Sequence, residues 1–176
     1  SLWSDAARKA PHKARPFTTL GDYYHQKGDF KAAIAHYKKG IENEPEFVEL
    51  YSNLGNVYLA EKKYKDAIAS YEQALEKDPN YDGAYNNLGA AVISQGKVEE
   101  AIAYYRQAIT LRPAFVEAHT NLGNALYDQG KLEEAIAAYR RAFELQPSDG
   151  LRIKIATRLP IIFESAQELM AARAKF

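Results

Sequence analysis

The sequence of 176 residues predicts an all-α fold, a right-handed α-solenoid of helix-turn-helix repeats followed by a C-terminal capping helix. Three observations predict it: a proline, a Leu-Gly pair, and an alanine followed four residues later by a tyrosine each recur with a period of 34 residues. The series are Pro11, Pro45, Pro79, Pro113 and Pro147; Leu20, Leu54, Leu88 and Leu122; Gly21, Gly55, Gly89 and Gly123; Ala33, Ala67, Ala101 and Ala135; Tyr37, Tyr71, Tyr105 and Tyr139. A fixed period of this length is typical of repeat proteins.

The period divides the chain into four full repeats with an incomplete segment at each end. Repeats 1 to 4 are residues 14–47, 48–81, 82–115 and 116–149. Residues 1–13 fit the tail of an earlier second helix, in which Trp3 would be a packing residue. Residues 150–176 begin like another first helix, but Pro160 would interrupt it. Ser165 and Glu168 then have the spacing of a capping box, so we expect capping helices there.

The first helix of each repeat is expected to pack through positions 4, 7, 8 and 11 of the repeat. In repeat 2 these are Tyr51, Leu54, Gly55 and Tyr58, which share one helical face. A helical glycine costs about 1 kcal/mol relative to alanine, so Gly55 indicates that the partner helix approaches closely. Ala67 is expected to provide the small surface opposite it.

Glycine and proline set the expected helix ends. Gly28, Gly96 and Gly130 suit the left-handed residue that ends a helix, and Lys62 occupies this place in repeat 2. Each second helix should end just before its proline, because the residue that precedes proline is disfavoured in a helix.

These repeats resemble the tetratricopeptide repeat over residues 14–149. The family's aromatic, Leu, Gly, aromatic, Ala, aromatic, Ala and Pro occur at positions 4, 7, 8, 11, 20, 24, 27 and 32. The departures are His119 at position 4, Val92 and Leu126 at position 11, and Gly40 at position 27. The resemblance implies a concave surface lined by the first helices, where a peptide or a partner protein would bind.

The C-terminal segment has a second resemblance. The stretch "LRIKIATRLPIIFESAQELMAARAKF" is similar to the link that follows the repeats in bacterial SPINDLY-type relatives of O-linked N-acetylglucosamine transferase. The opening "SLW.D....P.KAR" instead resembles repeat tails of bacterial membrane mannosyl-type glycosyltransferases. Either resemblance implies that the chain is the substrate-recognition arm of a larger glycosyltransferase.

Composition argues against several other functions. Lys plus Arg equals Asp plus Glu at 23 each, so a nucleic-acid partner is not expected. There is no cysteine, and no apolar run approaches the roughly 20 residues that cross a bilayer. The four histidines lack the i, i+4 spacing of a zinc helix, and the "QGK" stretches lack the glycine and hydroxyl residue of a phosphate loop. We therefore expect no metal, no cofactor, no membrane insertion and no enzymatic activity.

Positions 2, 5, 6, 9, 12 and 13 of the first helices are the predicted ligand surface. The candidate peptide-binding residues are Thr18, Asp22, His25, Glu49, Ser52, Asn53, Asn56, Asn86, Asn87, Glu117, Thr120, Asn121, Asn124 and Tyr127. Asparagine recurs at position 6 in Asn53, Asn87 and Asn121, which resembles the asparagine ladder of the O-linked N-acetylglucosamine transferase superhelix. Such amides could hold the backbone of an extended peptide, because each one donates and accepts hydrogen bonds. Alternatively, they bond to the adjacent helix.

We therefore expect a cytoplasmic scaffold that binds a peptide or partner protein along this surface. The carboxylate clamp of chaperone-binding relatives is not expected, because only Asn53 of its five residues is present and Asp22 would repel the carboxylate. Two alternatives remain at this point: the glycosyltransferase arm described above, and a homo-oligomer that forms through apolar end faces around Trp3.

Overall fold

The computed structural model describes residues 11–158. Within this range the chain forms nine α-helices and no β-strand, which confirms the predicted all-α fold. The described residues belong to two compact units that meet in sequence between Gln95 and Gly96, inside repeat 3.

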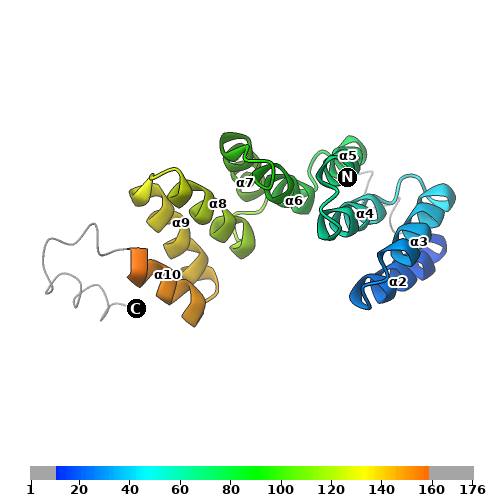
Figure 1. Cartoon of the computed structure of the whole chain (residues 1–176), viewed down its shortest axis with the longest axis horizontal. Helices are drawn as coiled ribbons and strands as arrows, with labels where there is room; N and C mark the ends of the chain where they lie inside the picture. Colours follow the sequence, from blue (N-terminus) through cyan, green and yellow to red (C-terminus); the bar gives the residue numbers. More distant parts are fainter. Residues whose placement is uncertain (1–10, 159–176) are drawn as a thin grey trace, which may run out of the picture. The chain divides into compact units, whose positions relative to one another are not determined.

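The first compact unit contains two helix pairs and one further first helix (Figure 1). Its helices are α2 (Pro11–Gln26), α3 (Phe30–Asn43), α4 (Val48–Ala60), α5 (Tyr64–Lys77) and α6 (Asp82–Ile93). Within each repeat α2 packs against α3 and α4 against α5, while α3 contacts α4 and α5 contacts α6. The first helices also contact one another, α2 with α4 and α4 with α6. They therefore form a continuous face of this unit.

The second compact unit continues the same pattern from a second helix (Figure 1). Its helices are α7 (Val98–Leu111), α8 (Val116–Asp128), α9 (Leu132–Leu145) and α10 (Asp149–Arg158). Each helix packs against the next one along the chain. Helix α10 begins one residue before the first residue of a fifth repeat in the 34-residue register.

The predicted helix boundaries agree closely with the structure. Helices α4, α6 and α8 begin at the predicted first residues of repeats 2, 3 and 4. Helices α3, α5, α7 and α9 each end two residues before the recurring proline, as its steric effect requires. Helix α2 begins at Pro11, three residues before Ala14, the first residue of repeat 1. Proline is tolerated in the first turn of a helix, where its missing N–H would have no partner.

A tyrosine ring, and not the opposing backbone, requires glycine at position 8. A Cβ atom added to Gly55 would lie 2.5 Å from the Tyr71 ring, and one added to Gly123 would lie 2.7 Å from the Tyr139 ring. Tyr71 and Tyr139 are fully buried, as are Ala67 and Ala135. The prediction of a close approach is therefore confirmed, with the difference that the position-24 tyrosine of the second helix fills the space.

The turns within the repeats adopt the predicted left-handed conformation. Gly28, Gly96 and Gly130 have φ angles of 77°, 78° and 74°. Lys62, at the same place in repeat 2, has φ 60° and is the non-glycine residue with positive φ in the described part of the chain. Because a Cβ atom disfavours this conformation, Lys62 is strained where the three glycines are not.

Several terminal predictions fall outside the described residues. Residues 1–10, including the predicted packing residue Trp3, are not described, and neither are Pro160 and the Ser165–Glu168 capping box. The predicted capping segment is residues 150–176. The structure describes residues 150–158 of it, which are helical and belong to α10.

Candidate ligand surface

The structure places the fourteen predicted ligand-binding residues on the first helices of the two compact units. Nine lie in the first compact unit, on α2, α4 and α6, and five lie on α8 of the second. Those of the first unit are Thr18, Asp22, His25, Glu49, Ser52, Asn53, Asn56, Asn86 and Asn87; those of the second are Glu117, Thr120, Asn121, Asn124 and Tyr127. We call the face of the first unit that carries the first set the first-helix face.

Two of the predicted residues do not belong to an accessible surface. Ser52 is 3% exposed and Asn86 is 1% exposed. Ser52 lies on α4, which contacts both α2 and α6. The Asn86 amide Nδ2 donates to Asn87 Oδ1 at 3.3 Å. Position 5 of repeats 2 and 3 is therefore interior, and we leave these two residues out of the ligand surface.

A recurring hydrogen-bonded group begins at Asp22. Its Oδ1 accepts the Tyr37 hydroxyl at 2.6 Å and the Asn53 amide Nδ2 at 3.3 Å. One oxygen at position 9 thus joins the second helix of its own repeat to the first helix of the next repeat. We call this arrangement a node. Burial, with a hydrogen bond to the Asp22 carboxylate, raises the pKa of the Tyr37 hydroxyl well above its ordinary value, so this hydroxyl stays a donor.

The second node is the same arrangement without a charge. Asn56 Oδ1 accepts the Tyr71 hydroxyl at 2.8 Å and the Asn87 amide Nδ2 at 3.0 Å. Burial raises the pKa of the Tyr71 hydroxyl, which likewise remains protonated at neutral pH. The two nodes connect α2 to α4 and α4 to α6 through polar side chains of the first-helix face.

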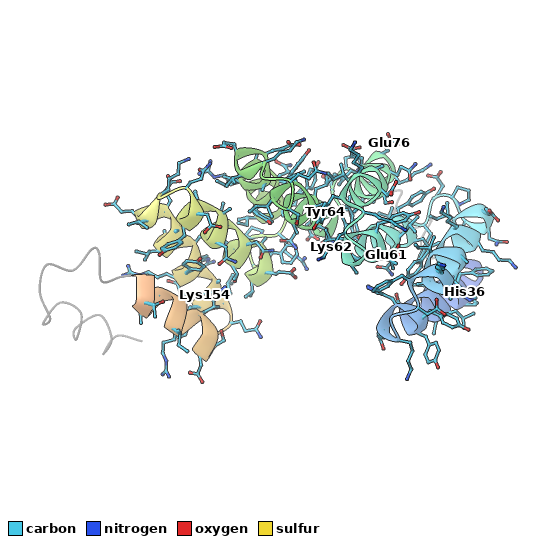
Figure 2. The ribbon with its side chains drawn as sticks, viewed as in Figure 1. His36, Glu61, Lys62, Tyr64, Glu76 and Lys154 are labelled. Carbon is cyan, nitrogen blue, oxygen red and sulfur yellow. The ribbon has the colours of Figure 1, made fainter. Side chains whose placement is uncertain are left out.

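A third node lies in the second compact unit and has a cation as its donor. Asn124 Oδ1 accepts the Tyr139 hydroxyl at 2.8 Å and the Lys154 ammonium at 3.3 Å. The Lys154 Nζ also lies 5.8 Å from the centre of the Tyr139 ring, within range of a cation–π interaction. Figure 2 labels Lys154 on α10. Lys154 therefore occupies the donor role that Asn53 and Asn87 have in the first unit.

The departure from the family pattern at position 4 has a simple structural account. The Tyr51 hydroxyl donates to the Pro45 carbonyl at 2.9 Å. His119 Nε2 lies 3.0 Å from the equivalent carbonyl of Pro113. Because a carbonyl oxygen only accepts hydrogen bonds, the proton of this bond is on His119 Nε2. Histidine at position 4 therefore makes the same bond as tyrosine, and His119 is a packing residue that is 8% exposed.

The remaining candidates differ in how much surface they offer. The hydroxyls of Thr18 and Thr120 donate to backbone carbonyls one turn earlier in their own helices. Glu49 and Glu117 are exposed. His25, Asn121 and Tyr127 are half-buried, and the His25 ring lies 5.8 Å from that of Phe30.

Sequence reasoning missed two features of the site. It gave no role to the hydroxyls of the tyrosines at position 24, although those of Tyr37, Tyr71 and Tyr139 donate to the side chain at position 9. It also left out Lys154, although extending the 34-residue register past residue 149 places Lys154 at position 5 of a fifth repeat. That register was the signal that could have found it.

The described part of the chain contains neither a metal-binding cluster nor a membrane-spanning helix. Among residues 11–158 there is no group of three or more His, Asp or Glu side chains that could hold a metal ion. None of the helices described is both long and apolar enough to span a membrane.

Comparisons with known proteins agree with this architecture. The family models described as TPR repeat and tetratricopeptide repeat match residues 21–62, 55–96 and 91–130, and residues 116–149, respectively. No sequence among the curated proteins matches the chain. These matches do not test the SPINDLY-type resemblance, which stays a prediction.

Solved structures with this fold include two of MamA and one of a Pseudomonas aeruginosa protein. One MamA structure is 26% identical with a TM-score of 0.71, and the similarity covers 94% of this chain and 87% of MamA. The other is 28% identical with a TM-score of 0.71, with 89% and 98% covered. Pseudomonas aeruginosa pilF, at 24% identity, shows the fold with a TM-score of 0.80 over 93% of this chain and 76% of its own. A repeat scaffold of this kind is consistent with protein–protein interaction, and the chain belongs to the tetratricopeptide repeat family.

Proposed function

We propose that the chain is a non-enzymatic scaffold that binds an extended segment of a partner protein on the first-helix face. The observation that carries the proposal is the row of amides on α4 and α6, at Asn53, Asn56 and Asn87. These side chains are half-buried, so they are fixed in place but still reach the surface. Fixed polar groups bind a ligand at a smaller entropic cost than mobile ones.

The nodes leave part of each amide available for a ligand. Asn53 uses one Nδ2 proton on Asp22, which leaves its other proton and its Oδ1. Asn56 accepts two bonds through Oδ1, and its Nδ2 takes no part in the node. The face thus offers amide donors at Asn53 and Asn56 and an acceptor at Asn53, and a peptide backbone can bind to both kinds of group. Asn53 and Asn87 make the bonds to the adjacent helix that were the alternative interpretation. In our proposal these bonds hold the amides in position for a ligand.

Affinity capture with matched variants tests this proposal. The intact chain, the triple variant Asn53→Ala, Asn87→Ala and Asn121→Ala, and a control triple variant would each be used to capture partners for identification by mass spectrometry. The control is Glu72→Ala, Gln73→Ala and Gln107→Ala, which changes exposed polar residues of second helices. We expect the asparagine triple to lose a partner that the wild type and the control retain.

A further variant separates lost binding from lost stability, because two of the asparagines also link repeats. Leu59→Glu changes a half-buried residue at position 12 of α4 that takes no part in a node. Circular dichroism should show a folded chain, and this variant should also lose the partner. Retention of the partner by both the asparagine triple and Leu59→Glu would refute the proposal.

A further inference from the structure

A pocket of about 330 Å³ lies between α8 and α10 in the second compact unit. Its volume is within the range of about 300 to 1,000 Å³ that small-ligand sites occupy. Apolar walls come from Val116 and Leu151, while the polar lining consists of Thr120, Gln146, Ser148 and Lys154. None of these residues is acidic, and none belongs to the first compact unit.

Lys154 provides the pocket with a positive charge that has no acidic partner in the described part of the chain. Its ammonium lies against a neutral amide oxygen, Asn124 Oδ1, and near the Tyr139 ring. The side chain is half-buried, so solvent screens the charge less than it would at a fully exposed site. One of the three ammonium protons is used in the node, which leaves two for a ligand.

Three further groups of the lining favour an anion. Ser148 Oγ accepts the Leu151 backbone N–H at 3.3 Å, so the hydroxyl proton is not used in that bond and can be donated. The Gln146 side chain is exposed and offers amide protons. Gly150 also lines the pocket, in the first turn of α10, where backbone N–H groups lack helical acceptors and the helix dipole favours negative charge.

The nearest acidic residue along the chain does not cancel this positive charge. Asp149 pairs with Arg152 at 2.9 Å, and its side chain is 83% exposed. Glu144, before the turn, pairs with Arg141 at 3.0 Å. Neither carboxylate lines the pocket.

We propose that this pocket binds a carboxylate of a peptide ligand, with Lys154 as the ion-pair partner and Ser148 as a hydrogen-bond donor. A single ammonium with neutral donors around it matches a singly charged carboxylate better than a phosphate, which carries nearly two charges. The carboxylate can come from a chain terminus or from a Glu or Asp side chain. The site extends the proposed scaffold function, and its ligand chemistry is independent of the amides on the first-helix face.

Three pentapeptide probes distinguish these sources by NMR titration of the ¹⁵N-labelled chain. They are acetyl-Ala-Leu-Gln-Leu-Ala with a free C-terminus, acetyl-Ala-Leu-Glu-Leu-Ala-amide, and the neutral acetyl-Ala-Leu-Gln-Leu-Ala-amide. We expect one of the acidic probes, and not the neutral probe, to shift the backbone signals of Ser148, Gly150, Leu151 and Lys154. The more effective acidic probe identifies the source of the carboxylate.

Charge-matched variants test the role of Lys154. Lys154→Met should weaken binding of the preferred acidic probe at least about fivefold, whereas Lys131→Met, which removes an exposed lysine elsewhere in this unit, should not. Lys154→Arg keeps the charge and should keep most of the affinity. This result would show that the site still folds when Lys154 is replaced.

Three results would overturn the proposal: no binding of either acidic probe, equal binding of the neutral probe, or unchanged affinity in Lys154→Met. Each of these leaves the asparagine variants and their captured partner unaffected. Failure of this proposal is therefore distinguishable from failure of the proposed scaffold function.

Discussion

The Asp22 node of the first compact unit and the Asn124 node of the second have the same hydrogen-bonding pattern with the charge in opposite places. In each, an oxygen at position 9 accepts a tyrosine hydroxyl of its own repeat and a donor of the next first helix. At Asp22 the acceptor carries the charge, whereas at Asn124 the donor, Lys154, carries it. The Asn56 node joins neutral side chains only, so the hydrogen-bonding pattern requires neither a charged acceptor nor a charged donor.

The links between repeats therefore also place charges on the ligand surface. The first-helix face carries a negative charge at Asp22, and the pocket beside α10 carries a positive one at Lys154. A residue can change this charge without loss of the node, because any oxygen can accept and any N–H can donate. A node does require a side-chain oxygen at position 9. Repeat 3 has Ala90 at this position, which has no such oxygen.

The largest effect is expected when the tyrosine hydroxyl is removed from each node in turn. Tyr37→Phe removes a bond to a charged acceptor, and such a bond contributes about 1.5 to 3 kcal/mol to the free energy of unfolding. Tyr139→Phe removes a bond to a neutral amide, which contributes about 0.5 to 1.5 kcal/mol. Urea denaturation followed by circular dichroism should therefore show the larger loss for Tyr37→Phe.

Tyr71→Phe is the matched control, because its acceptor Asn56 is neutral and its ring is as fully buried as the other two. It should resemble Tyr139→Phe. Equal losses for all three variants would mean that the Asp22 charge does not strengthen its node.

A smaller effect is expected at the turns, where the first unit has a strained residue and the second does not. Lys62→Gly relieves a left-handed lysine at φ 60° and should raise the free energy of unfolding by about 1 kcal/mol. Gly130→Lys introduces the same strain at φ 74° and should lower it by about 1 kcal/mol. Thermal unfolding of the pair measures both, and shifts of the same sign would contradict the assignment of strain to Lys62.

Periodicity predicts the helices well because helix boundaries depend on local chemistry. Proline and left-handed glycine act within a few residues of their own positions, so the ends of α3 to α9 follow from their spacing. Burial is harder to predict, because it depends on which neighbour covers a position. Ser52 and Asn86 have the register of surface residues but are covered, and the Tyr71 ring fills the space that Gly55 leaves.

The direction of a side-chain amide was equally beyond sequence reasoning. The register places Asn53 and Asn87 on the first helices, but one amide has several rotamers and several partners within reach. The structure shows that both turn toward the preceding first helix. The position of Lys154 follows from the register. That no acidic side chain among the described residues pairs with it could not be predicted, because it depends on how each carboxylate is oriented; Asp149, for example, pairs with Arg152.

The side-chain amide spectrum of the ¹⁵N-labelled chain, recorded with and without the captured partner segment, tests whether the three asparagines contact the ligand. We expect the Nδ2 signals of Asn53, Asn56 and Asn87 to shift on binding, while the signals of exposed second-helix residues such as Gln73 and Gln107 stay in place. Shifts confined to the second helices, with the three asparagine signals unchanged, would contradict the proposed function.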